Sequence, residues 1–234
     1  MTVKVQKSVQ RTTAPDIVPS VAALVGKLKE GQSFFMAGWS WKEYADLREE
    51  LRDRRLRITF DNGRLEVMPT SLSHETLSFL LNLLLCVWVE EMEIPIRGGG
   101  QFTFASRELA KGLQPDQCYW ITNIARVKGK KRLDFQHDPP PDLALEIEVT
   151  RTVLNRLEIY AALGVPEVWR CTETAIHVGL LQNDRTYSWG LESLVLPGFP
   201  FKKVQRTLRQ SISKDHTTLF RQFRTWVREH RETN

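Results

Sequence analysis

The sequence predicts a mixed α/β domain, and three stretches indicate this fold class. Two short apolar runs, Arg57–Phe60 and Arg64–Met68, flank Asn62-Gly63, and an Asn-Gly pair between such runs is typical of a tight β-hairpin. A helix that is apolar on nearly all sides follows from His74 to about Met92. The stretch from Pro140 to Trp169 has the pattern of a strand, a helix and a second strand. We therefore expect an antiparallel meander that leads into one crossover unit.

Composition and charge favour one cytoplasmic domain, or one domain with appendages. The chain has 234 residues, and 41% of them are hydrophobic, which is enough for a substantial core. The formal net charge of +5 permits a polyanionic partner without requiring one. Cys86, Cys118 and Cys171 lack CxxC spacing and are expected to be buried, reduced thiols. We expect no apolar run of membrane-spanning length and no signal peptide, hence no membrane contact.

Helical segments are expected before the hairpin. Residues 1–19 are predicted to form a loose N-terminal tail, followed by a domain over residues 20–200. Apolar residues at helical spacing run from Val21 to Leu28. A second helix is expected over Ser40–Arg54, with Ser40 as its N-cap.

Short strands are expected after the long helix, at Ile94–Arg97, Gln101–Phe104 and Leu113–Ile121. The glycines at 98–100 are interpreted as a plain turn, because no Lys-Ser/Thr follows them as in a phosphate-binding loop. The next segment, Asn123–Asp138, is expected to be an exposed excursion. Its basic cluster is a candidate DNA-binding site and consists of Lys128, Lys130, Lys131 and Arg132.

A hairpin and a helix are expected to end the chain. The hairpin joins Ala175–Leu181 to Thr186–Trp189. Residues 201–234 are predicted to contain a basic amphipathic helix packed on the domain, from about Lys214 to Arg231. We interpret its basic face as the solvated side of a docked helix, with DNA contact as the alternative; this face carries Arg221, Arg224, Arg228 and Arg231.

Two acids share one face of the strand predicted from Leu143 to Val149. Successive side chains of a strand point to opposite faces, so Glu146 and Glu148 point the same way. Acids on a buried strand are costly unless a cation meets them, and a bound metal ion is a common solution. The alternative is an edge strand with its polar face in water. Asp116 is a second acidic position, although the pair Pro115-Asp116 is also common in turns.

Four runs of this sequence resemble a large family of restriction-endonuclease-like proteins that is abundant in cyanobacteria. In order, they are LRITFDNGRLEVMPTSLSHE, QPDQCYWI, PPDLALEIEVT and LNRLEIYAALGVPEVW. The resemblance covers about residues 38–190. It implies the PD-(D/E)XK nuclease superfold, with a restriction-endonuclease-like core in which helices flank a central mixed β-sheet.

The resemblance also implies a metal site. Asp116 matches the Asp of the family's "PD", and Glu146 matches the acid of its "(D/E)XK". Together with the backbone carbonyl of Ile147, these carboxylates would hold Mg²⁺ or Mn²⁺. Such a metal lowers the pKa of a bound water and stabilises charge on a phosphate. Glu75 stands where many of these enzymes keep a further acid, beside His74, although a first-turn Glu also suits the helix dipole.

The lysine of the family motif is replaced in this chain. Glu148 occupies the usual position, two residues after Glu146. The family commonly moves the lysine to four residues before the tyrosine, and Arg156 has that spacing from Tyr160. An arginine can stabilise phosphate charge but, with a pKa above about 12, cannot act as a neutral base. We therefore expect Arg156 and Glu148 to complete the site; an exposed Arg156 paired with Glu158 or Glu148 is the alternative.

The resulting hypothesis is a metal-dependent DNA endonuclease, expected to be a homodimer by analogy with the superfold. The alternative is a nuclease-fold protein that binds nucleic acid or has a structural role without turnover. The sequence contains no GxSxG motif of serine hydrolases, no HExxH motif and no paired Cys/His spacing for zinc.

Overall fold

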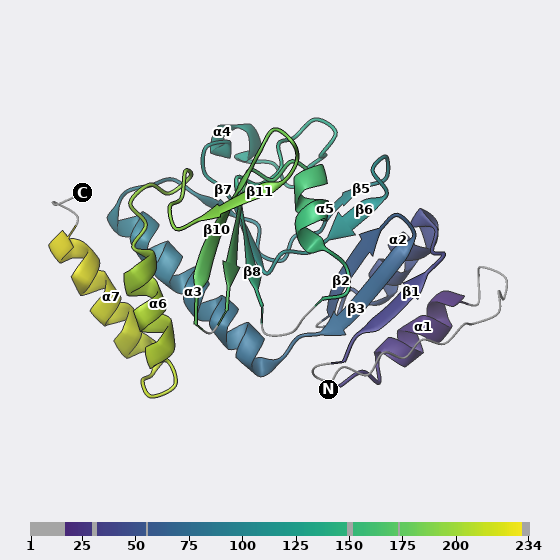
Figure 1. Ribbon diagram of the computed structural model, residues 1–234, viewed down its shortest axis with the longest axis horizontal. Helices are drawn as coiled ribbons and strands as arrows, with labels where there is room; N and C mark the ends of the chain where they lie inside the picture. Colours follow the sequence, from purple (N-terminus) through teal and green to yellow (C-terminus); the bar gives the residue numbers. More distant parts are fainter. Residues whose placement is uncertain (1–16, 30–31, 55, 149–151, 173, 231–234) are drawn as a thin grey trace. The chain divides into compact units, whose positions relative to one another are not determined.

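The computed structural model describes residues 17–29, 32–54, 56–148, 152–172 and 174–230, and these form two compact units (Figure 1). The first unit draws its described residues from Met1–Ser71, Thr103–Gln114 and Thr150–Leu163. The second draws them from Leu72–Phe102, Pro115–Val149 and Gly164–Asn234. The predicted division of the chain at residues 20 and 200 stays a prediction.

The first unit contains an antiparallel sheet with the strand order β1-β3-β2-β6-β5. Helices α1 and α2 share a hydrophobic core with β2 and β3, and α5 contacts β6. The bounds are α1 Ile17–Val25, β1 Phe34–Ala37, α2 Trp41–Glu50, β2 Leu56–Asp61, β3 Arg64–Pro69, β5 Phe104–Ser106, β6 Lys111–Leu113 and α5 Arg156–Ala162.

Local signals in this unit act as the sequence predicts. Asn62 and Gly63 both have positive φ, at 47° and 80°, and they join β2 to β3 in the expected hairpin. The Ser40 hydroxyl accepts a hydrogen bond from the Glu43 N–H, and the Glu43 carboxylate accepts one from the Ser40 N–H. This capping box satisfies two backbone donors at the start of α2 and confirms Ser40 as the N-cap.

The second unit contains a mixed sheet with the strand order β11-β10-β9-β8-β7-β4. Strands β8 and β9 are parallel, and the other neighbouring pairs are antiparallel. Figure 1 shows α6 and α7 beside α3, which crosses β8. The bounds are α3 Leu72–Glu91, β4 Arg97–Gly98, β7 Gln117–Trp120, α4 Ile124–Val127, β8 Leu143–Ile147, β9 Glu167–Cys171, β10 Ile176–Leu181, β11 Tyr187–Gly190, α6 Phe201–Gln210 and α7 His216–His230.

Helix α3 corrects the expectation about apolar runs. By length and composition alone, its 20 residues suffice to cross a membrane. A helix at the centre of a protein core passes the same test, and α3 has such packing. Leu80, Leu81, Leu84 and Leu85 are fully buried in the core of the second unit, together with β8, β9 and helices α6 and α7.

Strand β8 is central in its sheet, between β7 and β9, and all five of its residues are buried. Leu143, Leu145 and Ile147 join the core cluster that contains α3, as the alternation predicts. Glu146 on the other face is also buried, at 4% exposure. The alternative of an edge strand with its polar face in water is therefore wrong.

The mixed α/β fold class is confirmed, and the differences concern particular elements. The described strands form two sheets, and the hairpin belongs to the antiparallel one. Helix α1 begins at Ile17, inside the predicted tail, while residues 1–16, Val149 and Thr150 lie outside the described residues. Strands β4 and β5 each begin three residues later than expected. The sequence reading also missed β1, β6 as a separate strand, and helix α6.

Candidate functional site

Asp116 and Glu146 lie on two neighbouring chain segments of the second unit. Strand β7 pairs antiparallel with β8, with Gln117 opposite Leu145. Asp116 immediately precedes β7, and Glu146 lies within β8. The Asp116 N–H donates to the Leu145 carbonyl at 3.1 Å, so the two segments still touch at this point. Both acids are buried, at 1% and 4% exposure.

The Asp116 carboxylate is fixed by two neighbours of different kinds. Its Oδ2 accepts a hydrogen bond of 2.6 Å from the backbone N–H of Ile147. The same oxygen lies 3.2 Å from Nε2 of His74, in the first turn of α3. His74 is itself buried, and its Nδ1 lies 3.5 Å from Oε1 of the partly exposed Glu75. His74 therefore lies within ion-pair distance of both Asp116 and Glu75.

Glu148 follows β8 and forms an ion pair with Arg170 of β9. Nε and Nη2 of the arginine donate to the two carboxylate oxygens, at 2.6 and 2.5 Å. Arg170 is aligned with Glu146 in the parallel register and lies over the Trp189 ring, 5.1 Å from its centroid. Both Glu148 oxygens thus accept from a guanidinium, and action as a base or a metal ligand would require this pair to open.

Arg156 is buried inside the first unit, at 6% exposure. Its Nη1 donates to the Thr59 hydroxyl at 2.7 Å, and its Nη2 donates to the Gln114 carbonyl at 2.5 Å. The alternative of an exposed helix residue is therefore wrong. Glu158, the partner that this alternative proposed, instead accepts from the side chain of Asn155. Arg156 holds the chain two residues before Asp116.

The donor atoms at Asp116 and Glu146 suit a hard cation. Mg²⁺ is typically bound through one or two carboxylates and completes its shell with water and substrate oxygens. Two carboxylates and the Ile147 carbonyl supply that kind of donor. Within the described ranges, no group of three or more His, Cys, Asp or Glu residues is arranged to hold a metal ion.

Three further buried acids, which the sequence reading passed over, act as anchors for backbone amides. Glu66 accepts from the N–H groups of Val153 and Leu154, and Asp142 accepts from those of Ile121 and Asn123. Glu167 is treated below. Each is at most 2% exposed. Their carboxylates hold loops in place, which is a structural role.

Glu167 is the most extensively bonded of these anchors. Its Oε1 accepts from the Trp169 indole N–H and the Ser193 hydroxyl. Its Oε2 accepts from the backbone N–H groups of Leu194 and Val195, at 2.9 and 3.3 Å. The glutamate of the GVPEVW run therefore fixes the loop that precedes α6.

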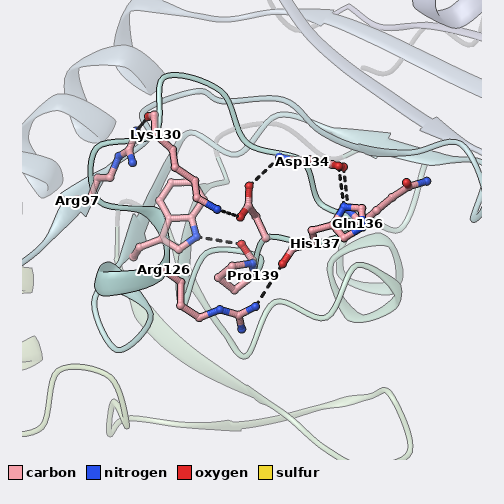
Figure 2. Close-up of polar contacts among 9 residues, drawn as sticks. Arg97, Arg126, Lys130, Asp134, Gln136, His137 and Pro139 are labelled. Carbon is pink, nitrogen blue, oxygen red and sulfur yellow. Dashed lines mark hydrogen bonds and ion pairs between the residues drawn. The ribbon is translucent and has the colours of Figure 1, made fainter.

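The excursion between β7 and β8 is closed by polar contacts (Figure 2). The Arg126 side chain reaches the carbonyl of His137, and the Trp120 indole N–H reaches that of Pro139. Arg97 donates to the carbonyl of Lys130. The excursion is therefore an organised loop with its own internal bonds.

The predicted basic cluster is only partly available to a ligand. Lys130 forms an ion pair with Asp138, as Figure 2 shows. Lys128, Lys131 and Arg132 are exposed. All four predicted cations are thus exposed, and one of them, Lys130, is paired with an acid of the same excursion.

The cysteines are free thiols, and two of them are buried as expected. Burial raises the pKa of the Cys118 and Cys171 thiols to about 12, so both stay protonated at neutral pH. Cys86 is only partly buried, contrary to the expectation for it. Cys118 and Cys171 are thereby unsuited to be nucleophiles.

Comparisons with known proteins agree with the motif-based resemblance. The model of the Uma2 family, described as "Putative restriction endonuclease", matches residues 41–203. A solved structure described as a putative nuclease of the DUF820 group from Anabaena variabilis is 15% identical, with a TM-score of 0.39. That match covers 71% of this chain and 90% of the other. A search of curated proteins found no match.

Proposed function

Because the chain belongs to the Uma2 family of restriction-endonuclease-like proteins, we propose that it is a metal-dependent endonuclease that hydrolyses DNA phosphodiester bonds. The observation that supports this most is the burial of two acids, Asp116 and Glu146, on neighbouring segments that are joined by hydrogen bonds from the Asp116 N–H to the Leu145 carbonyl and from the Ile147 N–H to Asp116. A buried carboxylate is costly unless hydrogen bonds or a cation compensate its charge, and a bound metal ion would do so here. The resemblance in sequence implies the same two carboxylates as metal ligands.

The residues would divide the work as follows. Asp116, Glu146 and the carbonyl of Ile147 would hold Mg²⁺ or Mn²⁺, which when bound lowers the pKa of a water and stabilises phosphate charge. The Ile147 N–H and His74 both contact one oxygen of Asp116. These contacts orient the Asp116 carboxylate before substrate binds. Glu75 supports His74 from the margin of the site.

Arg156 and Glu148 receive narrower roles than the sequence suggested. Arg156 donates to the Thr59 hydroxyl and the Gln114 carbonyl, both within the first unit, so we assign it a role in holding that unit together. Glu148 and Arg170 form a charge pair beside Glu146 in the register, and opening this pair on substrate binding would release a guanidinium toward phosphate. Both assignments keep an arginine, rather than a lysine, as the cationic element.

A second candidate function is nucleic-acid binding without turnover. The observation that favours it is that Glu148 and Arg156, which occupy the family's two lysine positions, both make internal contacts. Neither residue supplies a group that can shuttle a proton as a neutral amine. In this reading the fold and the acids persist while the chemical step is lost.

Plasmid cleavage tests the proposal. Supercoiled DNA is incubated with purified protein and Mg²⁺, Mn²⁺ or EDTA, and the Asp116→Asn and Glu146→Gln variants are compared with wild type. We expect metal-dependent cleavage that falls by at least about 100-fold in both variants, the scale of losing an essential catalytic group. The matched control is Glu158→Gln, an exposed acid, which should cleave like wild type.

The products also report on assembly, because a homodimer that cuts both strands gives linear DNA with little nicked intermediate. Cleavage in EDTA, or in both site variants, would contradict the metal-site assignment. No cleavage by wild type, with DNA binding intact, would favour the second candidate function.

A further inference from the structure

Helix α6 carries a row of cations that the site does not use. Lys202, Arg206 and Arg209 are spaced i, i+4 and i+7 and are all exposed, and we call them the basic stripe. The opposite side of the helix is apolar and buried, with Val204 at 0% and Leu208 at 5% exposure. The sequence of α6, FKKVQRTLRQ, contains no acidic residue. The helix therefore presents positive charge without local compensation.

On the neighbouring helix α7, by contrast, acids of α3 compensate the basic residues. Its Arg224 pairs with Glu90 and Glu91 of α3, and its Arg228 pairs with Glu91. In the described part of the chain, no ion pair joins a cation of the basic stripe to a carboxylate; Arg209 donates to the Thr174 carbonyl. Two basic faces on adjacent helices thus differ: acids of α3 neutralise much of one, and the other remains open.

Lys203 is a further cation of α6, beside the stripe. Its ammonium group lies 5.4 Å from the centroid of the Trp226 ring. Burial, followed by repulsion from Arg206, lowers the pKa of Lys203, and Lys214 adds to that repulsion. Glu229 acts in the opposite direction without reversing the shift. Burial is thus the main cause of the shift, and the neighbouring cations Arg206 and Lys214 add to it.

We propose that the basic stripe binds the sugar–phosphate backbone of duplex DNA. Lys202 and Arg209 are seven residues apart, which is about 10 Å along a helix that rises 1.5 Å per residue. One strand of duplex DNA carries a phosphate about every 3.4 Å of axis, so the stripe spans about three phosphates. Backbone contacts of this kind supply affinity without sequence readout.

The alternative polyanion is an anionic membrane surface, and the packing of α6 argues against it. A membrane-surface helix inserts its apolar face between lipids. Here that face is already buried against the protein, through Val204 and Leu208. The choice of DNA rests on the proposed function, but the binding and the cleavage can be measured separately.

The test measures binding of a fluorescent 20-base-pair duplex by anisotropy, in EDTA so that cleavage does not interfere, at several salt concentrations. The variant is Lys202→Gln/Arg206→Gln, which leaves the Arg209 contact with Thr174 intact. The matched control is Lys27→Gln/Lys29→Gln, which removes the same charge from two exposed lysines of the first unit.

Each phosphate contact contributes about 0.9 to the slope of log K against log salt. We expect the stripe variant to lose about 2 from the slope and to bind on the order of 10- to 100-fold more weakly at 0.1 M salt. The control should bind within about twofold of wild type, because only its net charge changes.

Equal slopes for wild type and the stripe variant would overturn the inference. So would equal losses in variant and control, which would indicate net charge alone, or binding to anionic vesicles without binding to DNA. Wild-type protein that binds through the stripe but does not cleave plasmid would keep this inference and refute the nuclease. Plasmid cleavage by wild type, with unchanged DNA binding in the stripe variant, would keep the proposed nuclease and refute this inference.

Discussion

Glu167 offers the sharpest test of the structure, through the change Glu167→Gln. Both oxygens of this buried carboxylate accept hydrogen bonds, from Trp169 and Ser193 on one side and from two backbone N–H groups on the other. A glutamine has one acceptor oxygen and one donor NH₂. Whichever way the amide is placed, donors face donors on one side of it.

The magnitude follows from those unmet donors. A buried donor without an acceptor costs about 1–3 kcal/mol. With two donors affected, we expect the free energy of unfolding to fall by about 3 kcal/mol. The size and shape of the side chain are nearly unchanged, so a cavity contributes little to this loss.

Urea denaturation followed by tryptophan fluorescence measures the effect, since Trp169 lies beside the substituted residue in the core. The exposed Glu158→Gln variant is the control, and its free energy of unfolding should stay within about 0.5 kcal/mol of wild type. A loss below about 1 kcal/mol in Glu167→Gln would show that the carboxylate is not the anchor described.

Two predictions concern the first unit. Burial would raise the pKa of Asp61, but hydrogen bonds from Lys111 and Arg64 outweigh it and lower the pKa below 3.8. A carboxylate whose pKa is lower in the folded state stabilises the protein at pH values above its unfolded-state pKa. This stabilisation is lost as the pH falls through the folded-state pKa. Asp61→Asn should therefore destabilise the protein at pH 7 and much less near pH 2. Urea titrations at both pH values measure this, and an equal loss at each would refute it. In Gly112→Ala, the new Cβ would lie 2.3 Å from the Tyr44 hydroxyl oxygen, and Tyr44 is fully buried and stacked on Phe60. Thermal unfolding should show a loss of about 1–3 kcal/mol, the cost of overpacking a core; an unchanged midpoint would mean that the ring moves freely.

The elements that the sequence predicted correctly depend on short-range chemistry. The Asn62-Gly63 turn requires positive φ, and Ser40 finds its capping partner three residues away. Helix α6 was missed because only Phe201, Val204 and Leu208 mark its buried side, and polar residues fill the rest. Its helical state depends on packing against α3 and α7, which local pattern cannot show.

In the candidate site, too, local sequence patterns predicted some residues, whereas roles that depend on partners far away in the sequence were not predictable. Alternation along β8 predicted Glu146 as a site residue, the family motif predicted Asp116, and the structure shows that both are buried. The roles of Glu66 and Glu167 depend on backbone amides that are 87 and 27 residues away in the sequence. The residues around each acid contain no pattern that predicts those partners. For the same reason, the burial of Arg156 through Thr59, 97 residues distant, was beyond the sequence pattern.

The chain crosses between the two compact units five times, since each unit is assembled from three separate segments. No single cut in the polypeptide therefore releases either unit whole and alone. A fragment that begins at Leu72 would contain every segment of the second unit, but it would also carry β5 and β6 without β2. The edge of β6 that pairs with β2 would then be bare, and bare strand edges promote aggregation. Truncation is thus a poor way to dissect this protein, and point substitutions in the full chain are the appropriate tool.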